Sequence, residues 1–283
     1  MDVVAKNFGA WCKRNYIITR GYVRIGTHKK SGLRGLIAAK NIPVDESIVA
    51  VPTVAMISFV TSMRDQTFTS MFLQNKLPLP ITKENMTTKL SGTFVHRTHM
   101  VLAMHMTHCH LSQDYERHDY MWYFDFLPRG EGNFGRLSNL LTQIIDSDAE
   151  CQEWLRVMGQ RHHVKPDEVR DMMIYFLTMI FSRSLPIDHF ATVGKLLEGS
   201  EFIEQLRQDS SLAIPCMCPV LDMCNHHPRE NAAVMVPDTP MKEARVVMVR
   251  STQPIPEGEE ILLTYGSGKM EELGLIYGID MAK

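Results

Sequence analysis

One short pattern occurs near both ends of the chain. Residues 42–48 read I-P-V-D-E-S-I and residues 255–261 read I-P-E-G-E-E-I, so both follow I-P-x-x-E-x-I. Each copy is a proline-led turn that leads into a predicted strand. Because the pattern occurs only twice, it is not a solenoid repeat. Two distant β segments with matching turns indicate one β-rich domain whose sequence is interrupted.

The hydrophobic period changes between the two copies. Residues 21–56 carry β signals, whereas residues 58–211 have helical periodicity. The β signals then return, with apolar runs at residues 246–249 and 261–263. The predicted fold class is therefore α+β, with a β-rich core that is split by a large, mostly α-helical insertion.

Two helices can be placed inside the insertion. One has apolar residues at i, i+3, i+4, i+7, i+8 and i+11, which are Val169, Met172, Met173, Phe176, Leu177 and Ile180. It is predicted to begin near Pro166, where a missing N–H is harmless, with Asp167 and Glu168 favouring the positive helix end. A second helix is predicted over residues 93–111. The predicted domain division is 1–57, 58–211 and 212–283.

Composition limits the kind of partner. The chain has 283 residues, enough for one large domain or two moderate ones. Its 30 basic and 32 acidic residues are nearly balanced, and no basic block stands out. A protein or small-molecule partner is therefore favoured over nucleic acid.

Targeting and redox signals indicate the compartment. Residues 1–14 hold no apolar leader, and the longest apolar stretch, residues 172–181, is too short to span a bilayer. Six cysteines at irregular spacing indicate free thiols in a reducing compartment. We expect a soluble monomer in the cytoplasm, the nucleus or both, with no membrane partner.

Two short motifs carry candidate chemistry. Residues 222–226 read D-M-C-N-H, and residues 263–266 read L-T-Y-G. Motifs this short are hypotheses about chemistry that depend on their structural context. Each also has an ordinary interpretation. The Asn-His dipeptide suits a turn, and Tyr265 suits a strand in which it packs with its hydroxyl outward.

Two other clusters resemble metal sites. Three cysteines lie within residues 216–224, but structural zinc needs four ligands, so these thiols are interpreted as small buried hydrophobes. His105 and His108 can share one helix face, whereas His110 turns away and no H-E-x-x-H motif is present. We therefore predict no metal, and a histidine cluster that is hydrogen-bonded or exposed.

Six elements follow one another along the chain. They are Phe8-x-x-Trp11 with Asn15, the glycine turn at residues 32–36, Trp122-x-x-x-x-Leu127-Pro128, Phe181-Ser182-Arg183, residues 222–226, and Tyr265-Gly266 followed by Leu273 and Tyr277-Gly278-Ile279. In this order they resemble the SET-domain protein methyltransferases. The resemblance is to the branch with a large helical insertion, which includes the Rubisco large-subunit lysine methyltransferases. It implies that the β-rich core is a SET core.

Three positions depart from the family's pattern. Met270 stands where the family usually has asparagine, Ile279 where it usually has phenylalanine, and Tyr16 where glycine often follows Asn15. The chain ends at Lys283, so the C-terminal substrate-binding lobe common in this branch is expected to be missing. The missing lobe concerns how a substrate docks and leaves the expected cofactor site intact. Met270 and the missing lobe favour a binding module without catalysis.

The resemblance implies S-adenosyl-L-methionine as the cofactor. Asn225 and His226 would bind it, largely through backbone and amide hydrogen bonds. The turn that contains Gly32, Arg34 and Gly35 would let the backbone approach its methionine end, as glycine permits. The same glycine pair also suits an ordinary hairpin turn.

The resemblance also places residues around the acceptor. Tyr265 is the expected catalytic residue, whose hydroxyl would orient the amine and, with backbone carbonyls, support the methyl group of the cofactor. Arg183 would bind the cofactor carboxylate, although it also suits the C-terminal end of its helix. Tyr277 and Leu185 would line the substrate channel, with plain packing as the competing interpretation of Tyr277.

The predicted function is S-adenosylmethionine-dependent protein N-methylation, on a lysine of a non-histone protein. A lysine amine has a reference pKa of about 10.4 and must lose a proton first. A desolvated channel and a nearby sulfonium charge both lower that pKa, so a dedicated base is optional. Two alternatives stay open: a SET-like binding module with weak or lost catalysis, and a histidine N-methyltransferase. The apolar Leu185 favours lysine.

Overall fold

The structure is a computed structural model, and it divides into two compact units. Unit 1 holds residues 3–56 and 217–265, and unit 2 holds residues 57–187 and 214–216. The residues that the structure describes are 3–74, 87–90, 93–128, 135–187, 214–236 and 246–265. The predicted boundary near residue 211 lies outside the described residues, so the three-part division stays a prediction.

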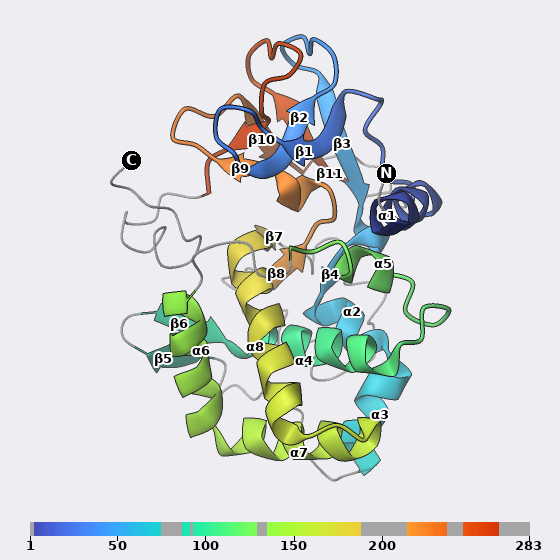
Figure 1. The fold of residues 1–283 in the computed structure, drawn as a ribbon, viewed down its shortest axis with the longest axis vertical. Helices are drawn as coiled ribbons and strands as arrows, with labels where there is room; N and C mark the ends of the chain where they lie inside the picture. Colours follow the sequence, from blue (N-terminus) through green and yellow to red (C-terminus); the bar gives the residue numbers. More distant parts are fainter. Residues whose placement is uncertain are drawn as a thin grey trace. The chain divides into compact units, whose positions relative to one another are not determined.

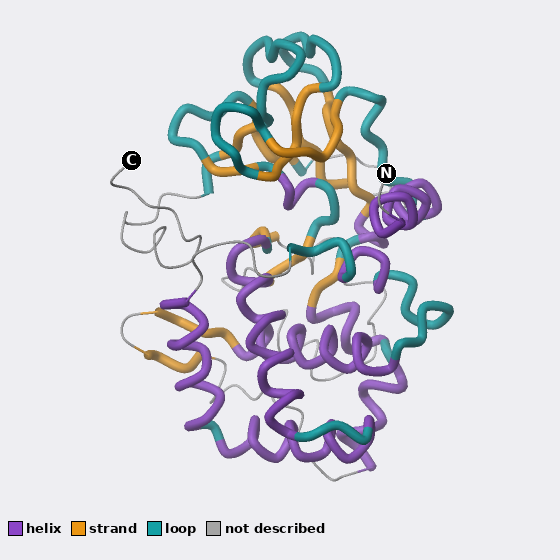
Figure 2. The backbone as a smooth tube through the Cα atoms, viewed as in Figure 1, coloured by secondary structure: helices purple, strands orange, loops and turns teal. Residues whose placement is uncertain are grey.

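Unit 1 begins with a helix and continues as short strands (Figures 1 and 2). Helix α1 (Val3–Arg14) buries Phe8 and Trp11, whose rings stack with centroids 5.9 Å apart. The remaining elements of unit 1 are β1 (Val23–Thr27), β2 (Arg34–Ala38), β3 (Ser47–Pro52), η1 (Thr53–Ala55), η3 (Leu221–Met223), β9 (Asn225–His226), β10 (Ala232–Met235), β11 (Val246–Ser251) and β12 (Leu262–Leu263).

The strand pair β3–β11 joins the early β segment of unit 1 to the late one. β1 pairs with β2 as an antiparallel hairpin, and β11 lies between β10 and β3 in an antiparallel sheet. β9 and β12 pair in parallel, with Asn225 opposite Leu262 and His226 opposite Leu263. The early β segment and the late one therefore form one β-rich unit, as predicted.

The two I-P-x-x-E-x-I copies pair with each other. Ile42 and Ile255 exchange two backbone hydrogen bonds, each 2.9 Å long, in an isolated antiparallel bridge. Ser251, which is buried, donates to the Pro43 carbonyl at 2.6 Å and accepts from the Glu46 N–H at 2.9 Å. These bonds join the first copy to the segment just before the second copy.

Unit 2 is mostly helical. Its helices are α2 (Phe59–Arg64), α3 (Gln66–Gln74), α4 (Arg97–Ser112), α5 (Met121–Phe124), α6 (Gly135–Ser147), α7 (Ala149–His162) and α8 (Pro166–Arg183). Five short strands accompany them: β4 (Ile57–Ser58), β5 (Thr87–Leu90), β6 (Thr93–His96), β7 (Leu185–Ile187) and β8 (Ile214–Met217). The predicted α+β fold class with a helical insertion is confirmed.

Helix α8 is the central packing element of unit 2. It contacts α4, α6 and α7, and it begins at Pro166 as predicted. Five of the six residues that define its apolar period are buried, and Met172 is half-buried. None of the helices in the described part of the chain is both long and apolar enough for a membrane span.

The second predicted helix starts later than expected. We predicted it over residues 93–111, but residues 93–96 form β6, which pairs with β5, and α4 begins only at Arg97. Thr93, Phe94 and Val95 are β-branched or aromatic, and such residues favour strands. Pairing with a neighbouring strand therefore overrides the helical period at this end.

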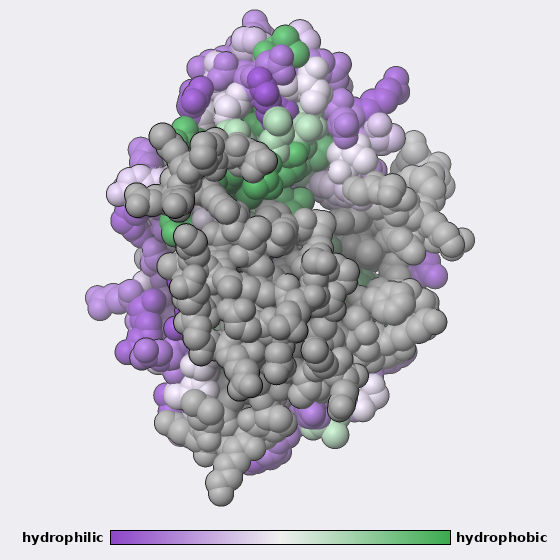
Figure 3. Space-filling view, turned by 180° about the vertical axis from the view of Figure 1, so that it is seen from behind, coloured by the Kyte–Doolittle hydropathy of each residue, from purple (hydrophilic) through white to green (hydrophobic). Residues whose placement is uncertain are grey.

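Much of the described surface in Figure 3 is hydrophilic, and hydrophobic residues gather in one area of unit 1. The exposed large apolar residues include Leu33, Val44 and Val54. All six cysteines are free thiols, and only Cys12 is not fully buried.

Replacing Ser251 should weaken the joint between the two parts of unit 1. Ser251→Ala removes the hydroxyl that forms hydrogen bonds with the Pro43 carbonyl and with the Glu46 N–H. We expect a loss of about 1–3 kcal/mol in the free energy of unfolding. Denaturant unfolding measures this loss, and Thr252→Ala at the exposed neighbouring residue should change the stability by less than about 0.5 kcal/mol. Equal stability of the two variants would contradict the role given to Ser251.

Candidate functional site

Asn225 joins three segments of unit 1. Its side-chain Nδ2 donates to the Arg34 carbonyl at 3.2 Å and to Glu260 Oε1 at 2.5 Å. Arg34 opens β2, Asn225 opens β9, and Glu260 lies just before β12. The amide therefore holds the predicted glycine turn next to the predicted Asn-His motif.

Gly35 is the residue that lets this amide approach. A Cβ added at Gly35 would lie 2.6 Å from Asn225 Nδ2, 3.0 Å from Glu260 Oε1 and 3.3 Å from the Met223 carbonyl. Real Cβ atoms are essentially never found as close as the first of these contacts. Among the described residues, the Asn225 and Glu260 side chains are thus the groups that come close to the backbone at Gly35.

Gly32 has a different task. It lies in the turn between β1 and β2 with φ +69°, a left-handed conformation that favours glycine. Its N–H donates to the His28 carbonyl at 2.9 Å, and the His28 N–H donates to the Leu33 carbonyl at 2.8 Å. Gly32 therefore closes the hairpin, as the ordinary interpretation of this glycine pair predicted, and positions Arg34 and Gly35.

Glu260 is a site residue that the sequence prediction missed. Its side chain is 5% exposed, and Oε2 accepts from Ser31 Oγ at 3.2 Å and lies 3.1 Å from His28 Nδ1. It occupies the position between the glutamate and the last isoleucine of the second I-P-x-x-E-x-I copy, where the first copy has Ser47. The adjacent Glu259 is 43% exposed, so only the strand alternation could have indicated that Glu260 points inward.

Tyr265 returns to the Asn-His segment. Its backbone N–H donates to His226 Nδ1 at 3.0 Å, the two rings lie 5.3 Å apart, and its hydroxyl donates to the Cys224 carbonyl. Burial lowers the pKa of His226, which agrees with an Nδ1 that accepts a hydrogen bond. The structure thus brings Tyr265 and the motif around Asn225 together at one place.

The buried thiols near this site are poor metal ligands. Cys216, Cys218 and Cys224 are at most 1% exposed. Burial raises the pKa of the Cys216 and Cys224 thiols, which disfavours the thiolate that a metal requires. Burial, followed by the negative charge of Asp222, also raises the pKa of Cys12 to about 12.

The other predicted site residues belong to unit 2 or lie outside the described residues. Arg183 ends α8 and Leu185 opens β7, opposite Cys216, so both belong to unit 2. Tyr277 and Gly266 lie outside the described residues. Their roles stay predictions.

The SET-domain family model matches residues 33–266 of this chain. Among solved structures, the SET domain of LSMT bound to lysine and AdoHcy superposes with a TM-score of 0.61 at 15% identity, covering 97% of this chain and 56% of that chain. Rubisco LSMT bound to AdoMet gives a TM-score of 0.61 at 14% identity, covering 98% of this chain and 56% of that one. These likenesses show the fold. No curated protein matches the chain.

A side chain at residue 35 should disturb the cluster that it faces. Gly35→Ala forces a methyl group against the Asn225 amide, so we expect a loss of about 1–3 kcal/mol in the free energy of unfolding. Denaturant unfolding gives this value. Gly9→Ala is the matched control, because a Cβ at Gly9 meets nothing within 4 Å and alanine is a better helix former than glycine. A Gly35→Ala protein as stable as the Gly9→Ala protein would show that the space at Gly35 is not required.

Proposed function

This chain belongs to the SET-domain family, and we propose that it is an S-adenosylmethionine-dependent protein N-methyltransferase that modifies a lysine side chain of a non-histone protein. The observation that carries the proposal is the meeting of the Tyr265 hydroxyl with the Cys224 carbonyl, one residue before Asn225. The chain covers only 56% of the LSMT chains that it superposes on, so the activity is inferred from this site.

The residues around Gly35 fit an adenosyl cofactor. S-adenosylmethionine supplies a methyl group on a positively charged sulfur. Carbonyl and hydroxyl oxygens suit that charge, and the Cys224 carbonyl and the Tyr265 hydroxyl are such groups. The backbone next to Gly35 and at β9 would hold the rest of the cofactor, with Asn225 and His226 as its principal binding residues.

Tyr265 has a defined part in this chemistry. A phenol oxygen can donate one hydrogen bond and still accept others. Donation to the Cys224 carbonyl fixes the direction of the hydroxyl, so its lone pairs can accept from the N–H of an incoming amine. The amine is then held with its own lone pair directed at the methyl carbon, and orientation of this kind contributes much of the rate of a displacement.

The atoms of the transfer balance without a metal or an oxidant. The lysine nitrogen forms a bond to the methyl carbon while the carbon–sulfur bond breaks, and its electron pair stays on sulfur. The ammonium proton leaves to solvent beforehand, since desolvation and the nearby positive charge lower the lysine pKa. Tyr265 therefore orients the amine and need not remove its proton.

The remaining roles extend the same proposal. Arg183 would pair with the cofactor carboxylate, and Arg34 would help to hold the methionine end. Tyr277 and Leu185 would line the lysine channel, where an apolar wall suits the lysine stem. We further propose a monomer that acts on protein in the cytoplasm or nucleus.

The competing function is a SET-like binding module without catalysis. Met270 departs from the family's usual asparagine, which favours that alternative. A titration of the full chain with S-adenosylmethionine, followed by methylation of a cell lysate with labelled cofactor, separates the two. Mass spectrometry of the labelled protein then identifies lysine or histidine as the acceptor. Failure to bind the cofactor, or binding without methyl transfer, would contradict the proposal that the protein is an enzyme.

Removal of the Tyr265 hydroxyl should abolish transfer and spare binding. Tyr265→Phe keeps the ring beside His226 but loses the group that orients the amine. We expect the turnover to fall about 100-fold or more, while cofactor affinity changes less than about threefold. Labelled-methyl incorporation and calorimetric cofactor titration measure the two effects. Tyr16→Phe at an exposed tyrosine of unit 1 is the control. Wild-type turnover in the Tyr265→Phe protein would exclude this role for the hydroxyl.

The charge of Glu260 should matter for cofactor affinity. Glu260→Gln replaces a charged acceptor by a neutral one and weakens the bond that holds the Asn225 amide. We expect S-adenosylmethionine to bind about 10-fold more weakly, since a charge-assisted bond is about twice as strong as a neutral one. Glu259→Gln is the matched control, because Glu259 is exposed, pairs with Lys30 at 2.7 Å and lies 3.9 Å from His28 Nε2. Equal affinities of these two variants would remove Glu260 from the site.

A further inference from the structure

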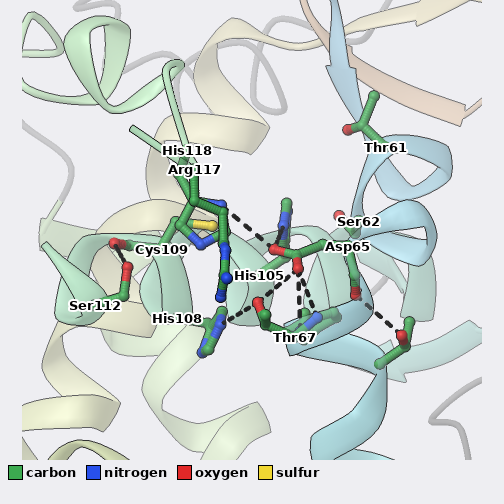
Figure 4. Close-up of polar contacts among 12 residues, drawn as sticks. Thr61, Ser62, Asp65, Thr67, His105, His108, Cys109, Ser112, Arg117 and His118 are labelled. Atoms are coloured by element: carbon green, nitrogen blue, oxygen red, sulfur yellow. Dashed lines mark hydrogen bonds and ion pairs between the residues drawn. The ribbon is translucent and has the colours of Figure 1, made fainter. Parts of the chain in front are cut away.

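Unit 2 contains a second polar cluster, far in sequence from the residues discussed above. Asp65 lies at the junction of α2 and α3, His105 and His108 project from α4, and His118 follows in the loop after α4. Figure 4 shows the three imidazoles converging on the carboxylate of Asp65 and on Thr67. His105, His108 and His118 are at most 3% exposed.

The carboxylate of Asp65 is held in one orientation. Its Oδ1 accepts from the Thr67 N–H at 2.8 Å, the Thr67 hydroxyl at 2.6 Å and the Phe68 N–H at 3.3 Å. Its Oδ2 lies 3.1 Å from His105 Nε2 and 3.5 Å from His118 Nδ1. Burial opposes ionisation of Asp65, but hydrogen bonds from His105 and Thr67 outweigh it and keep its pKa below the ordinary value.

His108 is oriented from both ring nitrogens. Its Nδ1 lies 3.0 Å from His162 Nε2, and its Nε2 lies 3.3 Å from the Thr67 hydroxyl, on the side of Asp65. With Nδ1 beside His162, Nε2 is the ring nitrogen that faces Thr67 and Asp65.

We propose that Asp65, His108 and His118 bind a divalent transition-metal ion, with Zn²⁺ as the best match. One ligand atom from each of the three lies within 4.8 Å of the other two. Tetrahedral zinc with bonds of about 2.0–2.2 Å places its ligand atoms about 3.3–3.6 Å apart, and the Asp65–His118 separation of 3.5 Å falls in this range. Two imidazoles and one carboxylate are a donor set that zinc accepts.

The surroundings meet the further requirements of a metal site. Metal-binding histidines usually have a hydrogen-bond partner on the other ring nitrogen, and His162 fills that place for His108. A cavity of about 400 Å³, lined in part by Asp65, Thr67, His118 and Tyr120, gives a route for the ion and room for water as a fourth ligand.

Asp65, His105 and Cys109 form a second group with the same spacing, but it is the weaker candidate. Burial raises the pKa of the Cys109 thiol, so its metal-binding thiolate is disfavoured. His105 instead contacts Asp65 Oδ2 and the Tyr120 hydroxyl, at 3.1 Å each, and so orients the carboxylate. Arg64 and Arg117 also line the cavity, and Arg117 Nε lies 4.0 Å from Asp114 Oδ2, which offsets part of the positive charge.

The test is a metal titration of the full chain after treatment with a chelator. Zn²⁺ is added in competition with a chromophoric chelator, and bound metal is counted by elemental analysis. We expect one Zn²⁺ per chain, bound at least about 100-fold more weakly by His118→Gln and by Asp65→Asn. Asp65 also accepts hydrogen bonds from the Thr67 and Phe68 N–H groups at the start of α3. Asparagine caps a helix about as well as aspartate, so Asp65→Asn preserves this cap. His110→Gln, which changes a histidine of α4 that lies against Phe176, should bind as the wild type does.

Cobalt provides a second, spectroscopic measurement of the same site. Co²⁺ in a site of this kind gives visible ligand-field bands whose strength reports the coordination geometry. We expect these bands in the wild-type protein and in His110→Gln, and their loss in His118→Gln. Wild-type protein that binds no Zn²⁺ and shows no cobalt bands, or folded Asp65 and His118 variants that bind as tightly as His110→Gln, would overturn the proposal. The cluster would then be a metal-free polar network.

Discussion

The parallel pairing of β9 with β12 is the contact on which the site in unit 1 depends. It joins only two residues of each strand, Asn225 to Leu262 and His226 to Leu263, so it needs support from side chains. Asn231 provides that support: its Nδ2 donates to the Glu260 carbonyl and its Oδ1 accepts from the Leu262 N–H, both at 2.8 Å. The pairing fixes where the chain goes after Leu263, and Tyr265 reaches the Cys224 carbonyl as a result.

Local patterns in the sequence predicted what local physics decides. Helix α8, from Pro166 to Arg183, was predicted from its apolar period. One segment contains both the apolar face of this helix and suitable residues at its two ends. The matching turns at residues 42–48 and 255–261 predicted one interrupted β domain, and their backbone pairing explains why. The predicted start of α4 was wrong, because residues 93–96 pair as β6 with β5. The helical period gives no information about that pairing.

Contacts between distant segments were the part that the sequence could not supply. The motif around Asn225 was evident, but its bond to Glu260 depends on how β2, β9 and β12 come together. The histidines of α4 show the same limit. Their helical spacing correctly separated His105 and His108 from His110, which lies against Phe176. Nothing in that spacing indicates that Asp65 and His118 lie beside His105 and His108. The prediction of no metal was made without these two residues, and it stays a prediction.

The split of unit 1 along the sequence sets the order in which the molecule can fold during synthesis. Glu46 and Ser251 are hydrogen-bonded although 205 positions separate them, and β3 meets β11 over a similar interval. In a growing chain β3 is therefore made long before its partner β11, whereas β1 and β2 can already pair with each other. The helices of unit 2 are completed by mostly shorter-range contacts and can form in the meantime. The early β segment is thus the part of this protein that most needs protection from aggregation while translation continues.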